Sequence, residues 1–461
     1  MNYDVLTDAR DPRPVHFVGI AGAGMSALAE LFVKRGVKVS GCDNNPGPMA
    51  EDLERLGVEV FAGHDPAHVI GARAVVFTSA MPKDSPELAA AHAAGIAVVR
   101  RAEALGAAVF GGDVIGVAGT HGKTTTTVMT TDALRGAGID VTGIVGGRVA
   151  AWGGNLSFGS DKLFVVEADE YDRSFLALHP AVAVVTNMEA DHLDIYRDID
   201  DIRDAFAAYV SGARVVVLCA DDPGANTLPV PNSAEVIRYG INSPDARLVA
   251  SDITPAGRGV TFSTRYDGAP FGDFRLNVPG LHNVRNALAA MASGIALGVP
   301  GVRLAAGLER FAGVERRFQY IADVRGVTII DDYAHHPTEI AATVDAARAA
   351  YPGRRLVVAF QPHLYTRTRD FAPEFGRVLA QADVLFLADL YPAREQPIEG
   401  ISAALVRDAA AACGNAVAWE GNRNELAQAL AQSVQPGDVV ITIGAGDITK
   451  TAGELRDLLA E

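Results

Sequence analysis

A glycine-rich turn at residues 119–125, with the sequence GTHGKTT, has the residue types that bind nucleotide phosphates. It follows the apolar run DVIGVA and precedes a helix-compatible segment that we expect to end near Gly136 and Gly138. Glycines let backbone N–H groups converge on phosphate oxygens, and the beginning of a helix favours an anion. Lys123 would neutralise the β- and γ-phosphates, and the Thr124 hydroxyl would bind Mg²⁺. The predicted phosphate loop comprises Gly119, Thr120, His121, Gly122, Lys123, Thr124 and Thr125.

The spacing of this loop departs from the common pattern G-x-x-x-x-G-K-[ST]. Val117 stands where the first glycine is usual, and Gly119 lies closer to Gly122. The alternative interpretation is a glycine turn that caps a helix, with an incidental lysine. We favour nucleotide binding because the preceding strand, the GKT sequence and the following helix agree.

Two polar residues beyond later apolar runs could complete a metal site with Thr124. Glu167 ends the run LFVVE, where a carboxylate can bind Mg²⁺ directly or hold its water molecules. His192 follows the run AVAVVTN and can be a neutral metal ligand or a substrate contact. The alternative for the second stretch is a solvated acidic loop with His192 at the start of a helix. The sequence thus predicts Thr124, Glu167 and His192 as metal-binding residues.

A second glycine cluster lies near the amino terminus. Gly19, Gly22 and Gly24 follow the apolar run VHFV and precede a helical segment, and Asp43 ends the next expected strand. The order is G-x-x-G-x-G, whereas the dinucleotide fingerprint is G-x-G-x-x-G, so NAD and a dehydrogenase are disfavoured. A nucleotide diphosphate other than NAD fits the start of the helix. The alternative is close strand-to-helix packing without a ligand.

The elements that must position these residues recur along all 461 residues. Short β-branched runs end in polar or glycine-rich clusters and are followed by helical segments. Runs of this kind are typical of parallel strands covered on both faces, and ligands bind beyond the carboxyl ends of such strands. We therefore predict an α/β fold. Boundaries near Gly106 and Gly313 give three domains, at 1–106, 107–313 and 314–461.

Composition excludes several other classes of protein. Lys and Arg total 40 against 56 Asp and Glu, a net charge of −16 that disfavours nucleic-acid and anionic-membrane binding. The three cysteines are scattered, which indicates a reducing compartment rather than a disulfide framework. The first residues, MNYDVLTDARDPRP, contain no apolar signal region. Residues 286–302 are too short and contain Pro300, so we expect no membrane span and a cytoplasmic protein.

Read in order, the motifs GTHGKTT, EADE, DHLD, GLHNVRN, DDYAHHPTE and GAGD resemble those of the Mur ligases, and they extend over all three predicted domains. The resemblance implies a Rossmann-like UDP-binding domain, a central P-loop ATPase domain with a mostly parallel sheet, and a Rossmann-like carboxy-terminal domain. It implies ATP-dependent, Mg²⁺-dependent ligation of L-alanine to the lactyl carboxylate of UDP-N-acetylmuramate through an acyl phosphate. This reaction belongs to peptidoglycan precursor synthesis.

The same resemblance implies a role for each matching residue. The UDP part of the substrate would contact Gly19, Gly22, Gly24, Met25 and Ser26, with Asp43 and Ser79 nearby. His282, Asn283 and Asn286 would meet adenine, and Arg316 or Arg317 would approach the phosphates. The joint substrate and amino-acid site would be lined by Asp332, Tyr333, His335, His363 and Arg367. Lys123, Glu167 and His192 would serve phosphoryl transfer, while His335 and Asp332 are weak candidates for the base that deprotonates the amine.

Several alternatives stay open at this point. A related ligase could add a tripeptide to recycle it, and a folate polyglutamate ligase is disfavoured by the amino-terminal glycine cluster. A dehydrogenase is disfavoured by the glycine order and by GTHGKT. A non-catalytic nucleotide-sensing module is disfavoured because acids and histidines follow many strands, and no N-K-x-D guanine motif is present. The sequence does not distinguish a monomer from a weak dimer.

Overall fold

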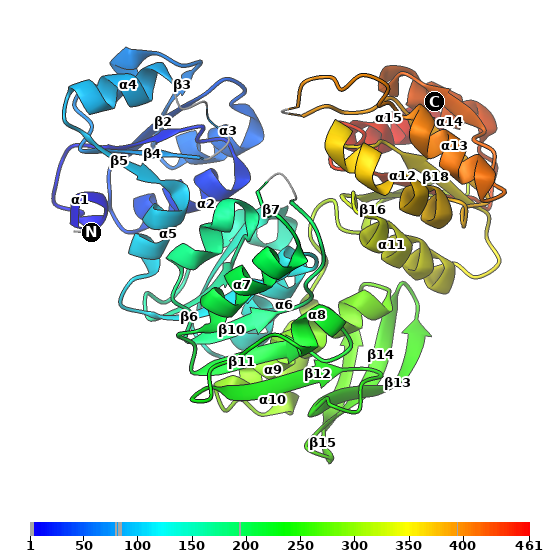
Figure 1. Cartoon of the computed structure of the whole chain (residues 1–461), viewed down its shortest axis with the longest axis horizontal. Helices are drawn as coiled ribbons and strands as arrows, with labels where there is room; N and C mark the ends of the chain where they lie inside the picture. The colour runs from blue at the N-terminus through cyan, green and yellow to red at the C-terminus, as the bar shows by residue number, and fades with distance from the viewer. Residues whose placement is uncertain (1–3, 79–80, 82–84, 193–194, 394) are drawn as a thin grey trace. The chain divides into compact units, whose positions relative to one another are not determined.

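The computed structural model describes residues 4–78, 81, 85–192, 195–393 and 395–461. The chain forms three β-sheets, each accompanied by helices (Figure 1), so the predicted α/β class is confirmed. It folds as two compact units. The first unit comprises Met1–Ile253, Phe262–Arg275 and Arg285–Phe311, and the second comprises Thr254–Thr261, Leu276–Val284 and Ala312–Glu461. The division into three domains stays a prediction.

The first sheet lies in the first unit and has the strand order β3-β2-β1-β4-β5, with every neighbouring pair parallel. Its strands are β1 (Val15–Val18), β2 (Val39–Asp43), β3 (Glu59–Ala62), β4 (Ala74–Phe77) and β5 (Ala97–Arg100). Its helices are α1 (Asp4–Thr7), α2 (Ala23–Lys34), α3 (Gly47–Arg55), α4 (Pro86–Ala93) and α5 (Arg101–Val109), with the 3-10 helix η1 (Pro66–Val69). The strand order reverses between β1 and β4, and such a switch point is where open α/β sheets bind ligands.

The second sheet has ten strands in the order β15-β14-β13-β12-β11-β10-β6-β9-β7-β8. Its strands are β6 (Asp113–Ala118), β7 (Thr142–Val149), β8 (Gly154–Ser157), β9 (Leu163–Glu167), β10 (Val182–Val185), β11 (Val215–Cys219), β12 (Glu235–Gly240), β13 (Leu248–Ala256), β14 (Gly259–Tyr266) and β15 (Ala269–Leu276). The helices are α6 (Lys123–Gly136), α7 (Ile199–Val210), α8 (Pro223–Asn226), α9 (Leu281–Ala296) and α10 (Gly301–Arg310), with 3-10 helices η2 (Ala150–Trp152) and η3 (Tyr171–Ala177).

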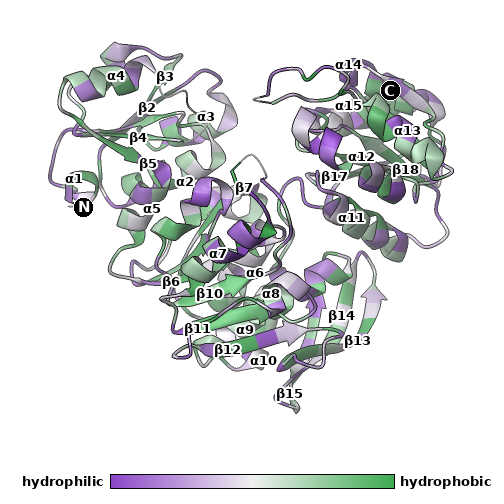
Figure 2. Ribbon diagram, viewed as in Figure 1, coloured by the Kyte–Doolittle hydropathy of each residue, from purple (hydrophilic) through white to green (hydrophobic). Residues whose placement is uncertain are grey.

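The centre of this sheet brings three functional segments to one edge. Strand β6 pairs in parallel with both β10 and β9, so the loops after all three strands leave the sheet on the same side. The middle strands β10 and β11 are coloured hydrophobic in Figure 2, as expected for strands covered on both faces. Helix α6 ends at Gly136, as predicted. The edge strand β8 is antiparallel to β7.

The third sheet lies in the second unit, with the order β16-β17-β21-β18-β19-β20. Its strands are β16 (Gln319–Val324), β17 (Val327–Asp332), β18 (Leu356–Phe360), β19 (Val384–Ala388), β20 (Trp419–Gly421) and β21 (Val439–Ile443). Its helices are α11 (Pro337–Ala350), α12 (Tyr365–Leu379), α13 (Ala404–Ala412), α14 (Arg423–Ser433) and α15 (Thr449–Ala460). Only the β16–β17 pair is antiparallel among its described pairs.

Alternate residues of the same strands build a core on each face of this third sheet. Ile330 of β17 packs into one hydrophobic cluster, and its neighbour Ile329 packs into the other. Both faces are therefore buried, which explains why β17 reads as a continuous apolar run. Across the described part of the chain, no helix is both long and apolar enough to cross a membrane.

Candidate active site

The predicted phosphate loop connects β6 to α6, and its conformation depends on two glycines. Gly119 has φ +139° and Gly122 has φ +78°, values that favour glycine. A Cβ atom on Gly122 would lie 2.7 Å from Oδ1 of Asn286, and one on Gly119 would overlap Oγ1 of Thr186. The backbone N–H of His121 donates to Oδ1 of Asn187 at 2.7 Å, which fixes the loop to the segment after β10.

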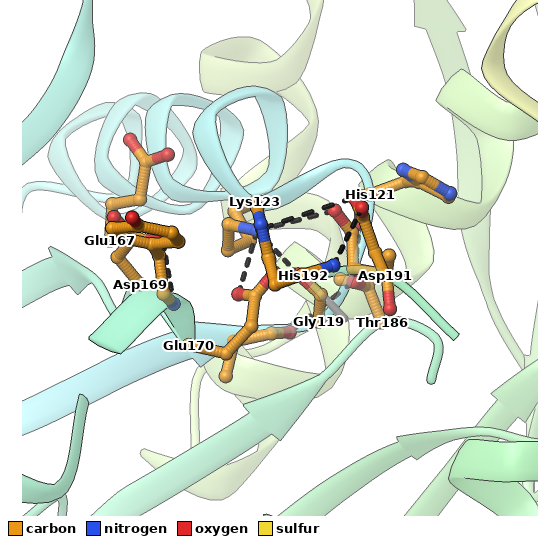
Figure 3. A network of polar contacts seen from close by, with 12 residues as sticks. Gly119, His121, Lys123, Glu167, Asp169, Glu170, Thr186, Asp191 and His192 are labelled. Carbon is orange, nitrogen blue, oxygen red and sulfur yellow. Dashed lines mark hydrogen bonds and ion pairs between the residues drawn. The ribbon is translucent and has the colours of Figure 1, made fainter. Parts of the chain in front are cut away.

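Lys123 is the first residue of α6 and is held in place by its own loop. Its ammonium donates to the carbonyl oxygens of Gly119 at 2.7 Å and Thr120 at 3.2 Å. It also forms an ion pair with Glu170, 2.8 Å from Oε2 (Figure 3). Burial lowers the pKa of Lys123, but the carboxylates of Glu170 and Asp169 outweigh burial and raise it above its usual value. The lysine is therefore charged and aimed at the loop.

Thr124 and Glu167, two of the predicted metal-binding residues, are in direct contact. The Thr124 hydroxyl donates to Oε1 of Glu167 at 2.8 Å, and the backbone N–H of Gly146 donates to Oε2 at 2.6 Å. The carboxylate stands at the end of β9, where the sheet order places it beside the phosphate loop. The predicted juxtaposition of these two oxygen donors is present in the structure.

His192, the third predicted metal-binding residue, joins the same network through Glu170. Its Nε2 lies 3.6 Å from Oε1 of Glu170 and 3.9 Å from Oδ2 of Asp191. Burial lowers the pKa of His192, but Glu170 and Asp191 outweigh it and the pKa is raised. The ring also meets Tyr171 edge-on, with the centroids 5.1 Å apart. A metal ion at this imidazole would have to compete with a proton.

Glu170 is the central residue that the sequence interpretation missed. It is only 3% exposed, and its carboxylate faces both Lys123 and His192. Burial raises the pKa of Glu170, but Lys123 and His192 outweigh it, so the pKa is lowered and the group is ionised. The hydroxyl of Tyr196 donates to the Glu170 backbone carbonyl at 2.6 Å and fixes this residue further.

The donor set fits Mg²⁺ and a nucleotide triphosphate. Hydroxyl and carboxylate oxygens at Thr124 and Glu167 are the hard ligands that Mg²⁺ prefers, and Mg²⁺ usually takes only one or two carboxylates besides substrate phosphates. The space over Gly122 is bounded by Asn286, whose Oδ1 also accepts from the Thr126 hydroxyl at 3.2 Å. The loop, the lysine and the helix start together suit phosphate oxygens.

The amino-terminal glycine cluster lies at the end of β1, and its shape is set by Asp43 at the end of β2. Oδ2 of Asp43 accepts the backbone N–H of Ala21 at 3.0 Å. Gly19 has φ +81°, while Gly22 precedes α2 in extended backbone with φ −63°. The structure therefore brings Asp43 and the predicted diphosphate loop together.

The other residues predicted to contact the UDP group lie in α2, where neighbouring side chains contact or cover them. Ser26 lies in α2, and its hydroxyl accepts from Nδ2 of Asn155 at 3.0 Å. Met25 is 2% exposed and Gly24 faces Arg101. Ser79, the remaining predicted substrate residue, lies outside the described residues.

The predicted adenine residues belong to two different units. Asn286 belongs to the first unit and contacts the phosphate loop, as described above. His282 and Asn283 belong to the second unit, where Nδ2 of Asn283 donates to the carbonyl oxygen of Pro279 at 2.7 Å. All three lie in α9.

In the second unit, both predicted arginines contact one aromatic ring. The Cζ atoms of Arg316 and Arg317 lie 4.6 Å and 4.9 Å from the centre of the Tyr333 ring. Arg316 also donates to the carbonyl oxygen of Gly444 at 2.8 Å, and Arg317 lies 3.5 Å from Glu339. Stacking of guanidinium groups on the ring holds both cations beside the end of β17.

Asp332 is the last residue of β17, His335 follows that strand, and His363 follows β18. The carboxylate of Asp332 accepts the backbone N–H groups of Phe318 at 2.8 Å and Ala334 at 2.7 Å. Burial raises the pKa of Asp332 to about 6. His335 and His363 have ring centres 6.0 Å apart, and Nη1 of Arg367 lies 3.4 Å from Nδ1 of His363. The structure thus gathers Tyr333, His335, His363 and Arg367, while Asp332 is engaged by the backbone.

Three family models match successive parts of the chain. The model described as "Mur ligase family, catalytic domain" matches residues 14–110, and "Mur ligase middle domain" matches residues 117–294. The model "Mur ligase, glutamate ligase domain" matches residues 316–446. The three matches follow one another along the chain in the order of the three sheets.

Individual relatives match nearly the whole chain. A UDP-N-acetylmuramate–L-alanine ligase from Cutibacterium acnes is 43% identical over 463 residues, covering 98% of each chain. The crystal structure of a UDP-N-acetylmuramate-alanine ligase, MurC, from Thermotoga maritima has a TM-score of 0.83 at 27% identity and covers 96% of this chain and 98% of its own. A murein peptide ligase from Psychrobacter arcticus has a TM-score of 0.72 at 26% identity, covering 97% and 99%.

Proposed function

The chain belongs to the Mur ligase family, and we propose that it ligates L-alanine to the lactyl carboxylate of UDP-N-acetylmuramate, with conversion of ATP to ADP and phosphate. The observation that carries this proposal is the similarity to the Cutibacterium acnes alanine ligase over 98% of both chains. The product is a precursor of peptidoglycan.

ATP would be held by the loop between β6 and α6. Backbone N–H groups of the loop and the start of α6 would face the phosphates, and Lys123 would carry the opposing charge. The Thr124 hydroxyl and the Glu167 carboxylate, 2.8 Å apart, would hold Mg²⁺, and His192 would contact a second ion. Mg²⁺ supplies positive charge that offsets the repulsion between the triphosphate and the attacking carboxylate.

The reaction proceeds in two steps, formation of an acyl phosphate and its aminolysis. The lactyl carboxylate attacks the γ-phosphorus, so one P–O bond forms, the bond to the β-phosphate oxygen breaks, and ADP leaves. The amine of L-alanine then attacks the acyl carbon, loses a proton and displaces phosphate. Lys123 would act in the first step, because its ammonium lies against the loop that would hold the phosphates, where negative charge accumulates. Glu170 holds Lys123 and His192 in one ionised network.

UDP-N-acetylmuramate would bind at the end of β1. Gly22 leaves room for a diphosphate at the start of α2, and Asp43 fixes the loop through the N–H of Ala21. Asn155 of β8 holds the Ser26 hydroxyl of α2, and so joins the segment assigned to UDP to the sheet that carries the phosphate loop. Both binding segments lie in the first unit.

The amino acid would be recognised in the second unit by the cluster at the ends of β17 and β18. Arg316 and Arg317, stacked on Tyr333, provide positive charge for carboxylate or phosphate oxygens. His335 is the better placed of the two candidate bases, because both carboxylate oxygens of Asp332 already accept backbone hydrogen bonds.

We further infer that the enzyme acts in the cytoplasm on small molecules. Its three cysteines, Cys42, Cys219 and Cys413, are free thiols, which suits a reducing compartment. The net charge of −16 suits small-molecule substrates better than nucleic acid.

The experiment that tests the function is phosphate release by the purified full-length chain. ATP, Mg²⁺ and UDP-N-acetylmuramate would be supplied with L-alanine, glycine, L-serine, L-glutamate or no amino acid. Phosphate release that requires UDP-N-acetylmuramate and is fastest with L-alanine, together with the expected product mass, supports the proposal. Phosphate release that is independent of the UDP-sugar contradicts it.

A further inference from the structure

A second cluster of metal-binding residue types lies in the first sheet, and the proposed reaction does not use it. Cys42 stands near the end of β2, His64 follows β3, His68 lies in η1 and Glu87 lies in the first turn of α4. Cys42 and Glu87 are 0% exposed. One ligand atom from each of Cys42, His68 and Glu87 lies within 4.8 Å of the others.

The distances among Cys42, His64 and Glu87 are close to those between ligands of a small tetrahedral ion. Sγ of Cys42 lies 3.5 Å from Nδ1 of His64 and 3.5 Å from Oε1 of Glu87. Bond lengths of zinc to sulfur, nitrogen and oxygen imply edges of about 3.3–3.6 Å between ligands of a tetrahedral site. His64 and Glu87 are closer, at 2.8 Å, because they share a proton. Replacing that proton by a cation requires a shift of only a few tenths of an ångström in each group.

Two imidazole nitrogens beside the cluster are buried without a partner. Among the described residues, neither Nδ1 of His68 nor Nε2 of His16 has a hydrogen-bond partner. Nδ1 of His16 is engaged by the Ser40 hydroxyl at 3.0 Å, so its other nitrogen is the one left over. The ring of His68 stacks on Phe61 at 4.5 Å, and the two histidine rings lie 6.2 Å apart. Buried polar atoms without partners are costly, and a bound ion satisfies them.

The charges of these groups also favour a cation. Burial raises the pKa of Glu87, but the Ser85 hydroxyl and His64 outweigh it, so the pKa is lowered and Glu87 is a carboxylate. Burial lowers the pKa of His16 to about 4, and repulsion from His68 adds to this, so His16 is neutral. Burial and Glu87 raise the pKa of the Cys42 thiol. A cation strong enough to displace the thiol proton would neutralise the buried carboxylate.

We propose that Cys42, His68 and Glu87, together with His64, bind a Zn²⁺-type divalent cation. Thiolate, imidazole and carboxylate are the ligands of zinc, whereas Mg²⁺ requires oxygen donors. Loading releases the Cys42 thiol proton to solvent, and the proton that His64 places between Nδ1 and Glu87 moves to Nε2 of the same ring, which frees Nδ1 for the cation. The donor set therefore differs in kind from that of Thr124 and Glu167.

The cation would stabilise the glycine loop through the backbone of Cys42. The carbonyl oxygen of Cys42 accepts the N–H of Gly19 at 2.8 Å and that of Ile20 at 3.1 Å. Ligation of its side chain fixes the strand end that supports this loop. Weaker binding of the UDP-sugar by metal-free protein is a consequence that rests on the proposed function, whereas metal stoichiometry does not.

The test is metal binding by the full-length chain after treatment with a chelator. Zn²⁺ would be titrated in the presence of excess Mg²⁺, which occupies the oxygen site, and bound zinc would be counted after buffer exchange. Co²⁺ would serve as a second probe, because cobalt bound to a thiolate gives a charge-transfer absorption band. We expect one tightly bound zinc per chain and a cobalt–thiolate band. Both should be lost in Cys42→Ser and in His68→Asn, and both should persist in Cys413→Ser, which changes an exposed thiol.

Two variants keep the proposal testable if one of them fails to fold. His68 is only partly buried, so His68→Asn should keep the fold where Cys42→Ser does not. Zinc and the cobalt band retained in both variants would overturn the proposal. A wild-type chain that holds no zinc after buffer exchange would overturn it too, and the two nitrogens would then be satisfied by water. A wild-type chain that binds zinc but does not bind the UDP-sugar would instead count against the proposed function.

Discussion

The ammonium of Lys123 lies 2.8 Å from Oε2 of Glu170, where the lysine is half-buried and the carboxylate is buried. The positive charge that we assign to phosphate binding is thus balanced by a carboxylate three residues after Glu167. Removing one partner of such an ion pair strongly destabilises the folded protein, because the charge of the other partner is left uncompensated. Glu170 also faces His192, so one carboxylate links two residues that we assign to phosphoryl transfer.

Lys123→Ala should nearly abolish turnover. Losing one charge contact to a transition state typically costs on the order of 10²–10³ in rate. Because the single variant leaves Glu170 unpaired, the double variant Lys123→Ala/Glu170→Gln is the matched control for folding. Both should be inactive in the phosphate-release assay, and the double variant should unfold at the higher temperature. Lys38→Ala, at an exposed lysine, should keep wild-type activity. Turnover near the wild-type rate in a folded Lys123→Ala protein would remove Lys123 from the mechanism.

Glu170→Gln should lower kcat while the KM for UDP-N-acetylmuramate stays nearly constant. The amide keeps the shape of the side chain but loses the charge that anchors Lys123 and His192. Removing such a supporting partner typically costs about 10–100-fold in activity or metal affinity. A steady-state comparison with Glu170→Asp, which keeps the charge, checks the cause, since that variant should recover part of the loss. Equal kcat in wild type and Glu170→Gln would assign Glu170 a purely structural role.

Glu167→Gln should raise the Mg²⁺ concentration needed for half-maximal turnover. Its carboxylate contacts the Thr124 hydroxyl at 2.8 Å, and an amide oxygen is a weaker ligand for a hard cation. We expect a shift of about 10–100-fold together with a lower maximal rate. The measurement is a Mg²⁺ titration at fixed total ATP, with Glu59→Gln at an exposed glutamate as the control. Superimposable curves would place Glu167 outside the metal shell.

How much the sequence predicted depended on where each residue stands relative to a buried strand. Glu167 and Thr124 adjoin continuous apolar runs, and parallel pairing of β6 with β9 brings such strand ends together. Strand β13 was missed because it offers no such run: its residues from Ser251 onward are exposed or half-exposed, and they include Asp252 and Pro255. Half-exposed strands lack the apolar continuity on which the prediction relied.

Glu170 and the Cys42 cluster were missed for different physical reasons. Glu170 belongs to the EADE motif, but it lies beyond β9, and the direction of its side chain depends on the turn that leads into η3. The position of Glu170 just after the predicted strand that ends at Glu167 was the only feature of the sequence that pointed to a role for it. The Cys42 cluster draws on residues from 42 to 87, and only the order β3-β2-β1-β4 brings them together. The spacing of these cysteine, histidine and glutamate residues along the sequence matches no metal-binding motif.

Gly22→Val should weaken binding of UDP-N-acetylmuramate and leave ATP binding unchanged. The backbone of Gly22 is extended with φ −63°, and a Cβ atom would lie 3.4 Å from the Gly19 carbonyl oxygen, an ordinary contact. The variant should therefore fold, and the added side chain should occupy space needed by the diphosphate. Calorimetry with the UDP-sugar, UDP, ATP and NAD measures this, with Gly212→Val as the control because nothing surrounds that position. Tight NAD binding without UDP-sugar binding would reverse the assignment.

The final prediction concerns the nucleophile: free L-alanine should be used and a tripeptide should not. The second unit gathers Tyr333, His335, His363 and Arg367, the residues we assign to the amino acid. A pocket shaped for a methyl group separates neighbouring side chains by only about 1–3 kcal/mol per methylene, so glycine and L-serine should be slow substrates. A charged amino acid should fail because moving its charged side chain out of water costs free energy. The measurement is competition between L-alanine and L-alanyl-γ-D-glutamyl-diaminopimelate at equal concentration, with the products identified by mass. Preference for the tripeptide would move the chain to the branch of the murein peptide ligases, while ATP-dependent ligation and the role of Lys123 would stand.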